Sequence, residues 1–304
     1  MKKVTTILAA VLAIAALAIV AVSCDGTTPD PDDNGLGDGR KISRLTQVGN
    51  PNALDEFDRH DRVYDFEYDA QNRLVSLTLP YYQQADDPRL RFVYADDRVT
   101  VTFPIGATSD VICDTEGNCE GGETHFGTAT IEAQLNAGGY IASGIFTTVW
   151  DNVPHNDESG TMSATYDANG YLTGLALNEG QSNVNHLSLT WTGGNLTRVQ
   201  ESPTHYAVAQ YTSSPNKANL DLNWLVYSAS FYSLDGFSMC AIAGLLGQRN
   251  QNLVAQTDEH YDEHIMKEAY SYVFDSEGYV TQWTTTPLDR PSSVPMTYKV
   301  EYRQ

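Results

Sequence analysis

The stretch "TYDANGYLTGLAL" (Thr165–Leu177) decides the fold, because it reads as a complete β-hairpin. Tyr166 ends one strand and Tyr171 begins the next. Between them, Asp167 can accept hydrogen bonds from the backbone that follows it and so start a type I turn. Gly170 then supplies the positive φ that closes the turn next to a G1 bulge. The stretch therefore predicts two antiparallel strands that fix their own register.

The same hairpin recurs along the chain, in "EYDAQNRLVSLTL" (Glu67–Leu79) and "VFDSEGYVTQWTT" (Val273–Thr285). The expected turn residues of the other copies are Asp69 with Asn72, Asn136 with Gly139, and Asp275 with Gly278. A shorter hairpin follows two of the copies at nearly the same offset, so residues 64–103 and 161–200 read as a duplicated two-hairpin unit. Short strands at such regular spacing indicate a β-meander that curls into a barrel.

Polar and apolar residues alternate along the expected strands. Met162, Ala164 and Tyr166 share one face, while Ser163 and Thr165 share the other. We therefore predict an all-β fold: an antiparallel meander of repeated hairpins forming a barrel-like or strongly curved sheet. A barrel embedded in lipid also alternates, but the Asp, Glu and Arg residues of the polar face argue against a continuous lipid-facing band. The 18 tyrosines favour cross-strand aromatic pairs over a sugar-stacking platform.

One segment departs from the hairpins, and we expect a helical insert at about 219–247. Asn219 or Asp221 could cap its start. The run "FSMCAIAGLLG" (237–247) is apolar all round, which predicts a buried helix that ends near Gly247. Cys240 in this run reads as a buried free thiol. The polar "QRNQN" (248–252) is expected to return the chain to the surface, and residues 41–304 to form a single domain.

The N-terminus reads as a secretory signal over residues 1–23. Lys2 and Lys3 form a positive region, and an apolar run that is too short for a lasting membrane span follows. The run Ala21-Val22-Ser23-Cys24 resembles a bacterial lipobox, which implies cleavage before Cys24 and lipidation of that residue. The alternative is an ordinary secretory signal with an incidental cysteine. Residues 24–40 are rich in Asp, Gly and Pro, and we expect them to form a disordered acidic tether.

Charge and cysteine spacing limit the partners. Removing the two positive charges of Lys2 and Lys3 from a formal charge of −21 leaves −23, which disfavours nucleic acid as a partner. Cys113 and Cys119 flank the turn-forming "DTEGN", so in an oxidising compartment we predict a disulfide between them. Metal thiolates are the alternative, and the chain has no second closely spaced cysteine pair to support it.

The densest group of metal-capable side chains lies in "TDEHYDEHIMKE" (257–268). There, His260, Glu263 and His264 spell H-x-x-E-H, which resembles the inverzincin signature of a zinc-binding helix. However, "AYSYVFDSEGYV" (269–280) begins a hairpin a few residues later, so an exposed strand or loop is the better interpretation. We therefore expect no catalytic residue and no cofactor, and at most an adventitious or structural divalent cation at these residues.

The "YDxxG" hairpins, together with "YTSSPNKANLDLNW" (211–224) and "GLLGQRNQNL" (244–253), resemble a family of Bacteroidetes lipoproteins of unknown function with a porin-like fold. The hairpins alone also resemble those of Rhs-type repeat proteins. The resemblance covers residues 41–304 and implies an antiparallel barrel, but it brings no activity with it. An acidic tether after the lipidated cysteine is a surface-export signal in such lipoproteins.

The resulting hypothesis is that the protein is a lipid-anchored lipoprotein of the cell envelope, located at the outer membrane. The sequence leaves open whether the protein is exposed at the cell surface. Its role is non-catalytic binding or structural work, with the membrane as one partner and an unknown ligand or envelope protein as another. The mouth of the barrel is the default ligand site. There are two alternatives. One is a carrier or assembly factor of the envelope that holds a lipid or other hydrophobic ligand, and the other is a zinc hydrolase that uses His260, Glu263 and His264.

Overall fold

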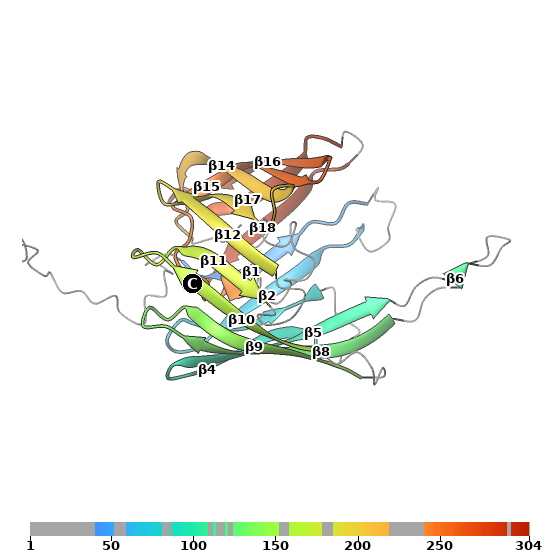
Figure 1. Ribbon diagram of the computed structural model, residues 1–304. Coiled ribbons are helices and arrows are strands. Elements are labelled where there is room, and N and C mark those ends of the chain that lie inside the picture. Colours follow the sequence, from blue (N-terminus) through green and yellow to red (C-terminus); the bar gives the residue numbers. More distant parts are fainter. Residues whose placement is uncertain are drawn as a thin grey trace, which may run out of the picture. The chain divides into compact units, whose positions relative to one another are not determined.

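The structure is a computed structural model that describes residues 40–51, 59–80, 85, 87–108, 112–113, 119–120, 124–151, 158–177, 185–218, 240–290 and 293–303. Almost all of the regular secondary structure in these residues is β-strand (Figure 1). The strands are β1 (Ile42–Gln47), β2 (Arg62–Tyr68), β3 (Leu74–Thr78), β4 (Arg89–Ala95), β5 (Arg98–Thr108), β6 (Ile112–Cys113), β7 (Cys119–Glu120), β8 (Thr124–Leu135), β9 (Ile141–Trp150), β10 (Glu158–Tyr166), β11 (Leu172–Leu177), β12 (Asn185–Thr192), β13 (Asn195–Gln200), β14 (His205–Pro215), β15 (Asn252–Tyr261), β16 (His264–Phe274), β17 (Val280–Pro287) and β18 (Met296–Tyr302).

Sixteen strands form one closed antiparallel barrel, and β6 pairs only with β7. Each strand of the barrel pairs with its neighbours in sequence, and β5 pairs with β8 around the small β6–β7 hairpin. The barrel closes because β1 pairs with β2 on one side and with the last strand, β18, on the other. The sequence prediction of an all-β meander is therefore confirmed, and of its two forms the closed barrel is the one adopted.

The predicted turns join the strands at one end of the barrel. In the β10–β11 turn, the Gly170 amide donates to the Asp167 carbonyl at 3.1 Å, and the Asp167 Oδ1 atom accepts from two further amides. Gly170 has a φ of +82°, and the register shifts at Tyr166, as expected for a bulge. The other three copies share this geometry at Asn72, Gly139 and Gly278, each with positive φ. Because each turn fixes its own register, repeated hairpins suffice to order the meander.

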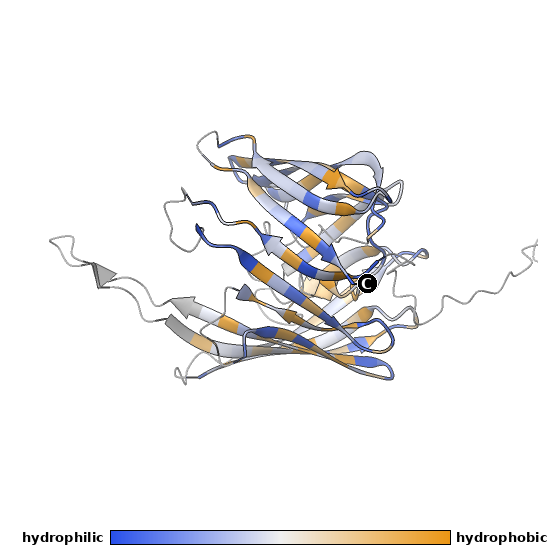
Figure 2. Ribbon diagram, turned by 180° about the vertical axis from the view of Figure 1, so that it is seen from behind, coloured by the Kyte–Doolittle hydropathy of each residue, from blue (hydrophilic) through white to orange (hydrophobic). Residues whose placement is uncertain are grey.

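The two faces of the wall differ as the alternation predicts, and Figure 2 shows hydrophobic and hydrophilic residues alternating along the strands. Side chains such as Leu90, Val101, Ile131 and Leu172 point inward and are buried. The inward apolar side chains of all barrel strands belong to one packed cluster, together with apolar residues of the segment 240–246. This cluster is the core of the protein, and it lies inside the barrel.

A ring of aromatic side chains closes the turn end of the barrel. Seven even-numbered strands carry, in their second half, an aromatic residue whose polar group donates to a backbone carbonyl at or near the start of the preceding strand, over 2.5–3.0 Å. The donors are Tyr68, Tyr94, Tyr166, Trp191, Tyr211, Tyr272 and Tyr302. The tyrosines thus serve the wall itself, because each ties two neighbouring strands together from inside.

The predicted helical insert differs from expectation where it is described. Residues 219–239 lie outside the described part of the chain. The remainder contains one helical turn over residues 240–242, which ends five residues before the expected end at Gly247. Gly244 has a φ of +77°, its amide donates to the Ala241 carbonyl, and the Leu245 amide donates to the Cys240 carbonyl. These paired bonds form a Schellman motif, so Gly244 and not Gly247 ends the helix.

Candidate functional site

The segment that begins with this helical turn plugs the end of the barrel at which the predicted turns lie. Residues 240–250 are mostly buried. The Leu245 carbonyl accepts from the Ile141 amide at 2.9 Å, and the Gln248 amide donates to the Gly170 carbonyl at 2.9 Å. Gly247 also forms an isolated β-bridge with Tyr171. The plug, which we define as residues 240–250, is therefore bonded to the hairpins around it at several points.

Asparagines continue the seal on the other side of the plug. Asn250 is buried, and its Oδ1 atom accepts from the Leu196 amide at 2.7 Å and from the Tyr211 hydroxyl at 3.1 Å. Asn195 and Asn252 bond to each other through side chain and backbone. The expectation that "QRNQN" returns to the surface is wrong for Arg249 and Asn250, because both are buried. The Asn250 side chain satisfies the strand end at Leu196, and the Arg249 guanidinium donates to the Ile242 carbonyl within the plug.

Two carboxylates on β15 and β16 face the interior, towards the end of the barrel opposite the plug. Glu259 on β15 is only 7% exposed, and burial raises its pKa, although the nearby His205 opposes this shift. Burial likewise raises the pKa of Glu268 on β16, and Arg290 opposes it from 3.9 Å. The Tyr270 hydroxyl lies 3.4 Å from both Glu268 and the Thr257 hydroxyl. Both carboxyl groups therefore hold a proton up to a higher pH than an exposed glutamate does.

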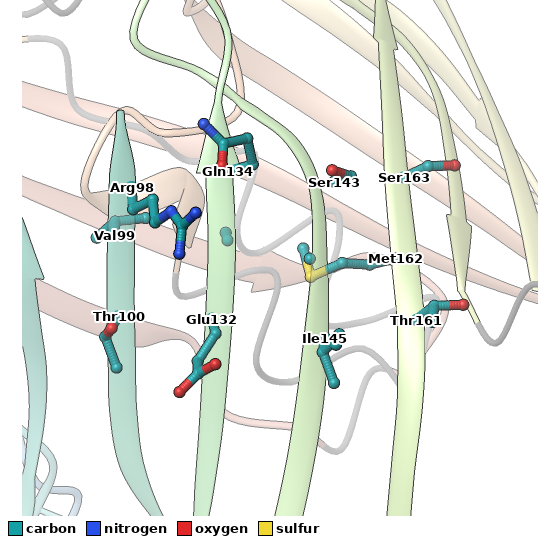
Figure 3. A pocket seen from close by; sticks show the side chains of 12 residues that line it. Arg98, Val99, Thr100, Glu132, Gln134, Ser143, Ile145, Thr161, Met162 and Ser163 are labelled. Atoms are coloured by element: carbon teal, nitrogen blue, oxygen red, sulfur yellow. The ribbon is translucent and has the colours of Figure 1, made fainter. Parts of the chain in front are cut away.

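A concave site lies on the outer wall. The outer groove crosses β5, β8, β9 and β10, and its volume is about 670 Å³ (Figure 3). The buried Val99, Ala133 and Met162 lie at its base, so the alternating side chains that project into it belong to the outward face. The outward residues of the groove are Arg98, Thr100, Glu132, Gln134, Ser143, Ile145, Thr161 and Ser163.

The outer groove escaped prediction from sequence because its residues share no motif. Its outward residues form two rows across the strands, one through Thr100, Glu132, Ile145 and Thr161, the other through Arg98, Gln134, Ser143 and Ser163. Only Gly144 gave a local signal, because a glycine inside a strand marks a close approach. A Cβ there would lie 2.8 Å from the Glu132 carbonyl oxygen and 3.0 Å from the Met162 sulfur.

The histidine motif adopts a β-hairpin in place of a helix. His260 lies on β15, His264 begins β16, and Asp262 between them has a φ of +50°. The register pairs His260 with Ile265 and Tyr261 with His264, so the two imidazoles point to opposite faces. His260 stacks on Tyr206 at 4.3 Å. The structure therefore does not bring His260, Glu263 and His264 together, and no metal-binding group of three was found in the described parts of the chain.

The remaining predicted sites are only partly described. Cys113 and Cys119 face each other in the β6–β7 register, but their side chains lie outside the described part, so the disulfide stays a prediction. Cys24, the signal and the tether up to residue 39 also lie outside it. Cys240 is a buried free thiol, as predicted, and burial raises its pKa to about 12.

Ion pairs cover separate parts of the outer wall. Arg44 pairs with Asp65 at 2.6 Å across β1 and β2, and Lys267 pairs with Asp258 at 2.9 Å across β15 and β16. Arg91 on β4 pairs with Asp87 at 2.6 Å. Charged pairs therefore lie on several arcs of the outer wall.

Among the residues described, no helix is both long and apolar enough to cross a membrane.

Comparison with known families decides the relationship of the chain. Residues 66–282, more than half of the chain, match the domain of unknown function DUF4595 with porin-like fold. The chain belongs to the DUF4595 family. The plug and the outer groove both lie within the matched residues, whereas β1 and β18, which close the barrel, lie outside them. No curated protein matches the chain.

One solved structure supports the barrel fold independently of the family match. A crystal structure of a porin-like protein from Bacteroides uniformis superposes with a TM-score of 0.58 at 14% identity, covering 87% of this chain and 99% of that one. A porin-like protein from Bacteroides vulgatus covers the same shares at 11% identity, with a TM-score of 0.49. At this identity the first likeness concerns the fold alone, and it agrees with the barrel described above.

Proposed function

We propose that the protein is a non-catalytic lipoprotein of the cell envelope, held at the outer membrane through Cys24, and that its barrel is a binding or structural scaffold. One observation carries the proposal: the plug packs into the interior and bonds to the surrounding hairpins. A barrel filled in this way is a solid support for its surfaces, and the ion-paired outer wall suits contact with water.

Arg40, the first residue that the structure describes, is held at the turn end of the barrel. The Arg40 guanidinium binds the carboxylates of Asp275 and Glu277 in the β16–β17 turn and lies 4.8 Å from the centre of the Tyr279 ring. The described chain thus begins at the plugged end of the barrel.

Two alternatives receive less support. A carrier of an apolar ligand needs a dry, open lumen, whereas the inward apolar side chains here pack against those of the plug. A zinc hydrolase needs two histidines on one face, whereas His260 and His264 lie on opposite faces. The proposal therefore assigns no catalytic residue and no cofactor.

Metabolic labelling with an alkyne-bearing palmitate in the native host tests the anchor. We expect label on the parent chain and on Cys240→Ser, whose thiol is buried, but none on Cys24→Ser. Label that persists in Cys24→Ser would contradict the anchor. The scaffold is tested separately by adding purified protein to planar lipid bilayers: unitary currents would show an open conduit and would contradict a filled barrel.

A further inference from the structure

We propose that the outer groove binds a neutral, polyhydroxylated ligand, such as a short segment of a saccharide chain. This inference goes beyond the proposed function, because it assigns a site and a ligand class on the outer wall. It rests on the shape of the groove, on the side chains that project into it, and on their balance of charge (Figure 3).

The shape fits a small extended ligand. The volume of about 670 Å³ falls in the range of ligand pockets, roughly 300–1,000 Å³. Neighbouring strands lie about 4.8 Å apart, so a row of residues across four strands spans about 14 Å. The two rows are two residues apart along each strand, a separation of about 7 Å. The outward groups therefore form an elongated floor and not a point site.

The chemistry of the floor mixes donors with acceptors. Arg98 contributes a guanidinium and Glu132 a carboxylate, and their charges cancel. Glu132 forms no ion pair with another described residue, and Arg98 has only a long contact of 3.8 Å with the neighbouring Asp97. Among the described residues, the Thr100 and Ser143 hydroxyls have no hydrogen-bond partner.

This mixture selects the ligand class. Glu132 would repel an anionic ligand and Arg98 would repel a cationic one, so a ligand of either charge is disfavoured on part of the floor. A sugar hydroxyl both donates and accepts, and it can therefore bond to the guanidinium, the carboxylate and the hydroxyls alike. Ile145, 52% exposed in the middle of one row, supplies an apolar spot for the C–H face of a ring.

The base of the groove depends on Gly144. A side chain there would collide with the Glu132 carbonyl and with the Met162 sulfur, so the glycine lets β8, β9 and β10 lie close together under the floor. None of the described residues that line the groove is aromatic, and hydrogen bonds to a ligand in this open groove would compete with water. We therefore expect weak binding, with a dissociation constant on the order of 1 mM for a short oligomer.

An NMR titration of the ¹⁵N-labelled full chain tests the proposal. The neutral probes are maltohexaose, cellohexaose, xylohexaose and mannohexaose, and the charged controls are hexagalacturonate and hexalysine. We expect at least one neutral probe to cause saturable shifts of amides on β5, β8, β9 and β10. The absence of any saturable shift up to about twenty times the expected constant would overturn the proposal, as would binding of the charged controls alone.

A matched pair of variants locates the site. Ile145→Asp places a second carboxylate on the floor, and Val273→Asp makes the same change at an outward position of β16 with the same 52% exposure. We expect the affinity for the neutral probe to fall at least tenfold in the first variant and to stay unchanged in the second. If Ile145→Asp does not fold, Ser143→Phe fills the groove instead. Equal affinity in all folded variants, or shifts confined to another part of the barrel, would overturn the assignment.

Discussion

The contact between the plug and the β10–β11 turn makes a quantitative prediction at Gly247. This residue has a φ of +91°, and a Cβ there would lie 2.5 Å from the Gly170 carbonyl oxygen and 2.9 Å from the Tyr166 ring. Gly193 also has a positive φ, +57°, but a Cβ there would meet no atom within 4 Å. The pair therefore separates the cost of backbone conformation from the cost of contact.

The expected magnitudes follow from these two costs. Placing an L-residue in the left-handed region costs about 1–2 kcal/mol, and this is the whole expected effect of Gly193→Ala. Forcing an extra methyl group into a packed contact adds about 1–3 kcal/mol, because a backbone carbonyl cannot move as a flexible side chain does. Gly247→Ala should thus lower the free energy of unfolding by about 2–5 kcal/mol.

Urea unfolding followed by tryptophan fluorescence measures both variants against the parent chain. A fall in the midpoint at constant slope would report lost stability without a change in the surface exposed. Hydrogen exchange of the Gln248 amide, which bonds to the Gly170 carbonyl, should accelerate in Gly247→Ala only. If the two variants cost the same within about 0.5 kcal/mol, the plug does not press on this turn and the reasoning fails.

Three further predictions concern single groups. Tyr166→Phe removes the 2.7 Å hydrogen bond to the Ile141 carbonyl and should lower the free energy of unfolding by about 1 kcal/mol. Equal stability of the variant and the parent chain in urea would show that these aromatic side chains do not tie neighbouring strands together. Burial raises the pKa of the Glu259 carboxyl, so its charged form destabilises the folded protein at a pH above that pKa. Glu259→Gln removes this charge and should raise the midpoint of thermal unfolding more at pH 7, where the carboxyl ionises, than at pH 4, where it is protonated. The opposite order would contradict the burial argument. Backbone hydrogen bonds from Tyr279 and Glu277, with Arg40, lower the pKa of Asp275. The Asp275 carboxylate therefore stabilises the folded protein at a pH above its ordinary pKa, and this contribution is lost as the pH falls through the lowered pKa. Asp275→Asn should make stability fall less steeply at acid pH, and an unchanged slope would refute this assignment.

The hairpins show why part of the fold was predictable from sequence. Asp167 and Gly170 act through neighbours within four residues, so the turn, the bulge and the alternation of Met162 and Ser163 follow from local chemistry. The repeat of that pattern then fixes the order of the strands, because a meander pairs each strand with the next one in sequence.

The outer groove and the interior were beyond prediction because their residues meet only across several strands. Glu132 and Ile145 are ordinary exposed residues in sequence, and the register alone aligns them in one row. The buried Asn250 looked like a surface residue until the strand ends that it bonds to were known. In the histidine motif, the sequence already favoured a strand or loop over a zinc-binding helix, and only the register showed that the hairpin turn at Asp262 separates His260 from His264.

The sequence by itself determined an all-β meander with Asp- and Gly-based turns, a strongly negative net charge, and a buried thiol at Cys240. These properties depend on local backbone preferences, on the period of the side chains and on net charge, which all act within a few residues or on the whole chain. Only the tertiary structure decided that β18 returns to β1, that the plug fills one end, and that the outer groove exists. Each of these depends on contacts between residues far apart in sequence, and no local pattern specifies which distant partners will meet.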